Sequence, residues 1–282
     1  MRRSFFPVNQ KSTKNSVTSW RPVPIYTAPD HLIKPTSFDC PKYNKLREAI
    51  MPAIIANISS KYDSFFKYLG NVSGFGDSIS FEQVLQIYDI SREIANGLPQ
   101  PDWVYKIWKE YDGNSTLELL KEMQRLRRFH ENSHENFSYL RGGFLLGEWL
   151  TRLKNVTKGI QYPPTKMALY SSHDGTLQAL MHILEVSNYQ LIPYAACIFM
   201  EVYKNKQNDY EIELYLRDSD GNLDVIIPYN CTFPCPLNEF LQTYEPKAIF
   251  SFRRLAQECE LKNCLNEASV SGSKGLLNKN DD

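Results

Sequence analysis

Residues 166–177 read KMALYSSHDGTL. The apolar run over residues 167–170 predicts a short buried strand, and the small polar residues that follow it predict a tight turn. After the His173-Asp174 pair, apolar residues recur at helical spacing over residues 177–184. The stretch therefore predicts a strand, a turn and a helix, which is the basic unit of an α/β fold.

The His173-Asp174 pair has two interpretations. At the carboxyl end of a strand and facing a helix N-terminus, it would lie where open α/β sheets place their ligands. Free N–H groups at such a helix end suit a phosphate, an imidazole can donate to an oxyanion, and a carboxyl group can transfer a proton. The structural alternative is that the dipeptide occurs by chance and that Asp174 is an ordinary helix N-cap.

The composition is that of a soluble globular protein. The chain has 282 residues, and 42% of them are hydrophobic. Lys+Arg and Asp+Glu both number 32, so the net charge is zero and gives no sign of a nucleic-acid partner. No apolar run reaches the length of a membrane span, and residues 1–10 lack the apolar centre of a signal peptide.

Glycosylation signals nevertheless predict a secreted protein. Six Asn-x-Ser/Thr sequons without proline at the middle position occur at Asn57, Asn71, Asn114, Asn136, Asn155 and Asn230. Such sequons are acceptors for N-linked glycans in secreted proteins, and six in one chain are hard to ascribe to chance. The simplest expectation is that the natural N-terminus, with its signal peptide, is missing from this sequence.

The cysteines support the same compartment. The six are Cys40, Cys197, Cys231, Cys235, Cys259 and Cys264. In an oxidising compartment they predict disulfides, and Cys231 could close a small loop with Cys235. The alternative is a zinc site formed by the 231/235 and 259/264 pairs. The sequons favour oxidation over metal binding, so we expect no metal and no cofactor.

Residues 41–135 predict a helical domain. Capping boxes at Ser80-Gln83 and Ser115-Glu118 mark helix starts, whereas Pro52 demands a kink or a break. A further long helix over residues 137–153 is interrupted by a Gly-Gly pair, which suggests close packing against another element.

Several cationic side chains need an interpretation of their own. The cluster comprises Arg125, Arg127, Arg128, His130 and His134. It could form an anion site, but such runs are more often a solvated helix face, and that is our prediction. His31 is likewise predicted to be a solvated loop histidine.

From residue 194 onwards the pattern changes to strands. Residues 194–203, 210–217 and 225–227 are strand candidates, and two helices are predicted over residues 237–244 and 247–257. The expected division is an incomplete α/β core from residues 1–40 and 136–264, a helical domain over residues 41–135, and a disordered polar tail over residues 265–282.

Five stretches, in this order, resemble histidine acid phosphatases of the prostatic and lysosomal type. They are WRPVPIYT at 20–27, LRGGFLL at 140–146, YSSHDGT at 170–176, PYAAC at 193–197 and CTFPCPL at 231–237. The His-Asp motif alone would be weak, but five matches in order are strong. The resemblance implies an α/β domain built on a mixed sheet, with an inserted helical domain.

The resemblance also implies an activity. Members of the family hydrolyse phosphate monoesters at acid pH through a phosphohistidine intermediate, so small phosphomonoesters or phosphoproteins are the expected substrates. His173 matches the phosphate-binding histidine, and Asp174 matches the residue that protonates the leaving alcohol. The family's nucleophile lies in an Arg-His-Gly-x-Arg-x-Pro loop, and Arg-His-Gly does not occur in these 282 residues. We therefore expect an N-terminally truncated sequence that lacks the nucleophile and the N-terminal part of the sheet.

By the same resemblance, Cys231 pairs with Cys235 and Cys40 with Cys259, although Cys264 is a rival partner for Cys40. Cys197 is either free or paired with Cys264. The implied location is secreted or lysosomal, and a homodimer is one expectation because acid phosphatases of this type are often dimers. The competing hypothesis is a catalytically inactive, secreted phosphatase-like protein that binds a phosphorylated ligand or a protein partner.

Overall fold

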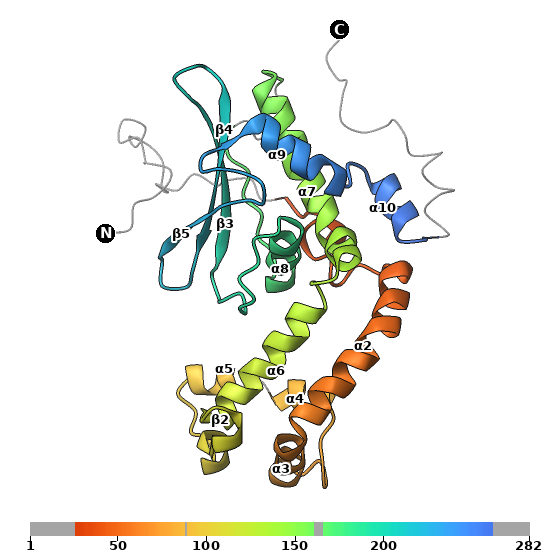
Figure 1. The fold of residues 1–282 in the computed structure, drawn as a ribbon, viewed down its shortest axis with the longest axis vertical. Helices are drawn as coiled ribbons and strands as arrows, with labels where there is room; N and C mark the ends of the chain where they lie inside the picture. Colours follow the sequence, from red (N-terminus) through yellow and green to blue (C-terminus); the bar gives the residue numbers. More distant parts are fainter. Residues whose placement is uncertain (1–25, 88, 161–165, 262–282) are drawn as a thin grey trace, which may run out of the picture.

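The computed structural model describes residues 26–87, 89–160 and 166–261 and combines helices with a small antiparallel sheet (Figure 1). The helices are α1 (Asp30–Ile33), α2 (Pro41–Lys61), α3 (Asp63–Ser73), α4 (Phe81–Ile87), α5 (Ile90–Ala95), α6 (Thr116–His130), α7 (Glu135–Thr157), α8 (Asp174–Ile183), α9 (Leu237–Tyr244) and α10 (Phe252–Glu258). The strands are β1 (Ile107–Trp108), β2 (Asn114–Ser115), β3 (Cys197–Lys204), β4 (Tyr210–Arg217), β5 (Leu223–Ile226) and β6 (Cys235–Pro236). Most of the WRPVPIYT segment, Cys264 and the predicted tail lie outside the described residues.

Helices α2 to α6 share one hydrophobic core. In Figure 1, α2 and α6 run from the half that holds the sheet to the end that holds α3, α4, α5 and β2. Phe65, Leu69 and Met123 are fully buried in this core. Trp108 is also buried, and its indole Nε1–H donates to Thr116 Oγ1 at 3.0 Å, so the burial leaves no unsatisfied donor. The helical nature of residues 41–135 is as predicted; that they form a separate domain stays a prediction.

The local helix signals of this part are confirmed, with one exception. Ser115 and Glu118 form the reciprocal bonds of a capping box at the start of α6, and Ser80 and Gln83 form the same pair at the start of α4. Pro52, in contrast, does not break α2, which continues for 21 residues. Its side chain is exposed, so water can reach the backbone where the proline removes a hydrogen bond.

The sheet is centred on β4, which pairs antiparallel with β3, β5 and β6. β4 spans the predicted residues 210–217, whereas β3 begins three residues later than predicted. Ile212 and Leu214 point into a core that includes side chains of α7, α8 and α9. Within the described residues the sheet is antiparallel throughout, not mixed as expected, but the expected combination of helices with a sheet is confirmed.

The predicted strand over residues 167–170 is not formed. These residues have no regular secondary structure, and the side chains of Met167 and Leu169 are 57% and 79% exposed. A buried strand needs neighbours on both edges and cover on both faces. No strand among the described residues pairs with this segment, so its apolar residues remain on the surface.

The segment is tied to α7 by its last residue. The hydroxyl of Tyr170 accepts a hydrogen bond from Arg152 Nε at 2.7 Å and donates to Glu148 Oε1 at 3.3 Å. Burial is the main cause that raises the pKa of Tyr170 to about 12, with the Glu148 carboxylate acting in the same direction. Tyr170 therefore stays protonated and fixes the chain just before the His-Asp pair.

Glycines of α7 allow two close approaches. A Cβ atom at Gly142 would lie 2.7 Å from the carbonyl oxygen of Ala179 in α8, and one at Gly147 would collide with the carbonyl oxygen of Ile249. The predicted close packing at the Gly-Gly pair is confirmed. The predicted interruption is wrong, because α7 is continuous through both glycines. The contact at Gly142 sets the position of α8 and thus of the residues at its start.

Two disulfides fix the chain. Cys40 pairs with Cys259 and Cys231 pairs with Cys235, as the resemblance implied. With three of its four candidate sulfurs oxidised, the zinc alternative is no longer available. Cys197 is a free, half-buried thiol. Among the described residues, every helix is too short or too polar to span a bilayer.

Candidate active site

His173 and Asp174 lie at the N-terminus of α8. Asp174 is its first residue and His173 is the N-cap, whose carbonyl oxygen accepts from the N–H groups of Thr176 and Leu177 at 3.0 and 3.2 Å. The helix forms because its other face is apolar and buried against α7 and the sheet. Both side chains of the pair are exposed. The alternative that Asp174 is the N-cap is therefore wrong, since the cap is the backbone of His173.

Asp174 forms an ion pair that the sequence did not predict. Arg128 Nη2, at the end of α6, lies 3.1 Å from Asp174 Oδ2, and Arg128 Nη1 lies 3.8 Å from Glu131 Oε2. The Nε of Arg128 is buried and has no hydrogen-bond partner in the described part of the chain. One cation from the helical part thus reaches the exposed carboxylate at the start of α8.

The end of α1 and the turn that follows it contact the first residues of α8. The carbonyl oxygen of Ile33 accepts from Thr176 Oγ1 at 2.8 Å and also from Ser172 Oγ. A Cβ atom at Gly175 would lie 2.8 Å from Thr36 Cγ2, so only glycine fits here without displacing that side chain. The His-Asp pair is consequently held from both sides by bonds to one backbone carbonyl.

Arg141 fixes this supporting turn. Its Nη1 donates to the carbonyl oxygens of Pro35 and Phe38, the latter at 2.9 Å, and its guanidinium lies 3.8 Å from the ring centre of Tyr43. The side chain is buried, and this burial lowers its pKa below the ordinary arginine value. Arg141 was recognised in the sequence only as part of LRGGFLL; nothing in its local pattern indicated contacts to residues a hundred positions away.

The basic cluster is not the solvated face that we predicted. Its three arginines are half-buried and paired: Arg125 binds Glu122 through two nitrogens at 2.6 and 2.7 Å, and Arg127 binds Glu131 at 3.0 Å. Arg128 contacts Asp174. The prediction failed because it considered the basic residues alone. Their carboxylate partners lie one helical turn away or on another helix.

The remaining histidines have contacts of their own. His31 is half-buried between the rings of Phe144 and Phe252, and its burial lowers its pKa, so the prediction of a solvated histidine is wrong. His134 Nδ1 caps α7 by accepting from the N–H of Asn136. Burial lowers the pKa of His182 to about 4 and also lowers that of His130.

The six sequons remain predicted glycosylation sites, and the structure shows how far each acceptor asparagine is exposed. None of the acceptor asparagines is buried: four are exposed and two are half-buried. The exposed ones are Asn57, Asn71, Asn136 and Asn230, and the half-buried ones are Asn114 and Asn155.

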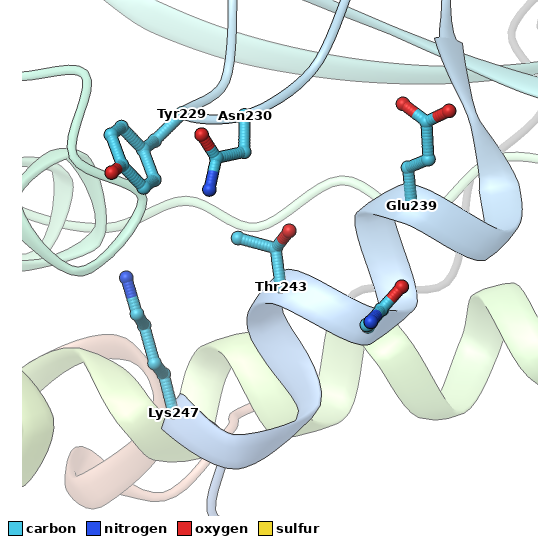
Figure 2. A pocket seen from close by; sticks show the side chains of 6 residues that line it. Tyr229, Asn230, Glu239, Thr243 and Lys247 are labelled. Carbon is cyan, nitrogen blue, oxygen red and sulfur yellow. The ribbon is translucent and has the colours of Figure 1, made fainter.

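Two cavities lie away from the His-Asp pair. One, of about 440 Å³, is lined by residues around Asn230 and α9 (Figure 2). The other, of about 510 Å³, lies between the end of α2 and the start of α6. The described residues contain no group of three or more His, Cys, Asp or Glu side chains suited to a metal.

The arrangement at α8 has a defined chemical capacity. An exposed imidazole at the N-cap and an exposed carboxyl group at the first helical residue belong to one helix N-terminus, where the helix dipole favours negative charge. Such a site can hold an oxyanion and move a proton at the carboxyl oxygen. Arg128 supplies a cation in contact with that carboxyl group.

The chain resembles known phosphatases over most of its length. The model of the histidine phosphatase superfamily (branch 2) matches residues 5–217. Mouse prostatic acid phosphatase is 30% identical over 250 residues, which are 86% of this chain and 63% of that protein. Human lysosomal acid phosphatase is 30% identical over 263 residues, 91% of this chain and 59% of that protein. The chain thus spans about three fifths of the length of these relatives. The chain belongs to the histidine phosphatase superfamily, branch 2, and is related to the prostatic and lysosomal acid phosphatases.

Proposed function

We propose that this chain is part of an acid phosphatase, a phosphoric monoester hydrolase in which His173 binds the phosphate and Asp174 protonates the leaving alcohol. The observation that carries the proposal is the exposure of both side chains at the N-terminus of α8. Family membership supports the reaction class.

The physical chemistry of phosphoryl transfer suits this site. The reaction is catalysed mostly by positioning and by stabilising charge on the phosphoryl oxygens. The partial positive charge at the N-terminus of α8 and a donating imidazole provide such stabilisation. A carboxyl group beside them can deliver a proton to the alkoxide as it leaves, and an acidic medium keeps that proton available.

A complete reaction also needs a nucleophile. A phosphohistidine intermediate would form on a second histidine, and Arg-His-Gly does not occur in the 282 residues. The remaining histidines cap a helix or are half-buried against other groups. The proposal therefore assigns His173 and Asp174 to binding and proton donation and assigns the nucleophile to no residue of this sequence.

We further propose a secreted or lysosomal location. Two disulfides and six surface-accessible sequons support it, because both features are typical of an oxidising compartment. The second candidate function is a phosphatase-like protein that binds a phosphorylated ligand without turning it over. The ion pair between Arg128 and Asp174 favours this alternative, because a carboxylate that is paired with a cation is engaged and not free to donate a proton.

One experiment separates the two candidates. The native glycoprotein would be assayed for hydrolysis of p-nitrophenyl phosphate at acidic pH, and its binding of orthovanadate, a phosphate analogue, would be measured by calorimetry. Turnover together with vanadate binding that His173→Ala weakens supports the phosphatase. Vanadate binding that depends on His173 without turnover supports the binding protein. If the protein shows no turnover and no vanadate binding, both candidate functions are overturned.

A further inference from the structure

The cavity beside α9 contains a glycan acceptor in its wall. It is lined by Tyr229, Asn230, Glu239, Gln242, Thr243 and Lys247 and has a volume of about 440 Å³. Figure 2 shows the Asn230 amide projecting from its loop towards Thr243, with Tyr229 beside it and Lys247 rising from the opposite wall. The acceptor nitrogen of a sequon thus borders a preformed space.

The loop that carries Asn230 is well fixed. Asn230 has φ +56°, a left-handed conformation that asparagine tolerates better than most residues. The N–H of Cys231 donates to the carbonyl oxygen of Pro228 at 3.1 Å, and the Cys231–Cys235 disulfide closes the loop. Because β6 pairs with β4, the base of the loop is anchored in the sheet. The backbone on either side of Asn230 is therefore held by these contacts.

The lining suits a neutral, hydroxyl-rich ring. The Tyr229 ring is 55% exposed and offers a flat apolar surface, while the amide of Gln242, the hydroxyl of Thr243 and the carboxylate of Glu239 offer hydrogen bonds. The charge of Lys247 is already engaged, since its Nζ pairs with Glu185. A cavity of this size is within the range of sites that hold small molecules, roughly 300–1,000 Å³.

Asn230 differs from the other sequons. Asn57, Asn71 and Asn136 are exposed on α2, α3 and α7 and line neither of the two cavities. Asn114 does line the second cavity, but it is half-buried and its Nδ2 donates to the Tyr111 carbonyl oxygen at 2.9 Å. Asn230 combines exposure with a place in a cavity wall.

We propose that Asn230 carries an N-linked glycan whose first N-acetylglucosamine occupies this cavity and bridges the Cys231–Cys235 loop to α9. In the transfer, Asn230 Nδ2 forms a bond to C1 of the sugar and loses a proton. The C1–O bond to the lipid diphosphate donor breaks, and the released diphosphate leaves as the lipid-linked product. Because the sugar is then tethered at the rim, its effective concentration is on the order of millimolar, and weak contacts suffice to seat it.

This inference rests on the secretory location in the proposed function, not on phosphatase activity, so its test does not involve turnover. The protein would be secreted from a host that makes high-mannose glycans, and the Asn230 peptide would be examined by mass spectrometry. One portion would be treated with an endoglycosidase that leaves one N-acetylglucosamine on the asparagine. A second portion would be incubated without denaturant with an amidase until the whole glycan has been removed. Hydrogen exchange would then be measured over residues 237–247.

If the first sugar is seated, protection of residues 237–247 persists after the endoglycosidase and falls several-fold after the amidase. Under native conditions the amidase releases the Asn230 glycan more slowly than the Asn57 glycan, and the two rates become equal after denaturation. Gln242→Ala, which keeps the sequon, should abolish the difference, whereas Ser73→Ala, which removes only the Asn71 sequon, should leave it intact. An unmodified Asn230, or equal exchange after both enzymes, would overturn the proposal.

Discussion

The guanidinium of Arg128 lies 3.1 Å from the carboxylate of Asp174 and connects the end of α6 to the first turn of α8. The two residues are 46 positions apart in the sequence and belong to different structural parts. The side chain of Arg128 is 24% exposed and that of Asp174 is 49% exposed, so the pair is partly shielded from water. This pairing makes the orientation of the proposed proton donor depend on the helical part.

Arg128→Met tests that dependence. We expect the free energy of unfolding to fall by about 1 kcal/mol, the upper end for a partly exposed ion pair. In the active native protein, hydrolysis of alkyl phosphates should fall several-fold because the Asp174 carboxyl group loses the contact that orients it. Arg127→Met, one residue away and paired with Glu131 instead, is the matched control. If the two substitutions lower alkyl phosphate turnover equally, Arg128 does not orient Asp174 for proton donation.

Asp174→Asn tests proton donation. Turnover of an alkyl phosphate should fall by roughly a hundredfold or more, the scale of general acid catalysis, because the alkoxide leaves poorly without a proton. Turnover of p-nitrophenyl phosphate should fall much less, because nitrophenolate leaves unaided. Asp220→Asn, in the exposed turn between β4 and β5, is the control for the loss of one carboxylate. Equal slowing of both substrates would exclude Asp174 as the donor.

Gly147→Ala tests the close approach of α7 to the chain after α9. The added Cβ atom would collide with the backbone oxygen of Ile249, which cannot rotate away. We expect a loss of stability of about 1–3 kcal/mol by urea denaturation, as for overpacking elsewhere. At Gly143 the nearest atoms are two carbons of the flexible Ile249 side chain, at 3.1 and 3.2 Å, and the carbonyl oxygen of Lys247 at 3.2 Å, which is much farther than the Ile249 oxygen is from a Cβ atom at Gly147. Gly143→Ala should therefore lower the free energy of unfolding clearly less than Gly147→Ala does. A larger loss for Gly143→Ala would contradict the packing described.

His182 should make the protein less stable in acid. Its folded-state pKa is lowered by burial to about 4, from 6.5, so the unfolded chain binds the proton more readily. The contribution of His182 to the free energy of unfolding therefore falls as the pH decreases from about 6.5 to about 4. Below that window this contribution no longer changes.

Because His182 is partly exposed to water, we expect its protonation to lower the free energy of unfolding by about 2 kcal/mol across this window. It would be measured as the change in urea midpoint across the window, which His182→Gln should reduce. An unchanged pH dependence in this variant would show that His182 does not titrate as its burial requires. The effect is of interest because the proposed enzyme would work on the acid side of neutrality.

The sequence predicted those features whose partners are near in the chain. The Ser115-Glu118 capping box and the alternating strand β4 depend on contacts within a few residues or on a simple period, and both are confirmed. The helix after the His-Asp pair was predicted for the same reason, although it begins at Asp174 and not after it. The two disulfides were predicted from the family resemblance, since spacing alone could not decide among the partners.

The features that failed depend on distant partners. An apolar run becomes a strand only if other strands flank it, and none among the described residues flanks Met167. The contacts of Arg128 and His31 likewise come from other helices, so their local sequence context placed both in solvent incorrectly. In the candidate site, therefore, the His-Asp pair could be found from the sequence, but the arginine that contacts it could not.

The Cys40–Cys259 disulfide joins positions 219 residues apart, at the start of α2 and just after α10. A single proteolytic cut at any loop between them would leave both fragments covalently connected. Such a nicked molecule would run as two bands on a denaturing gel only after reduction. Maturation or damage by proteases in an acidic, protease-rich compartment would accordingly be invisible to any size measurement made without a reductant.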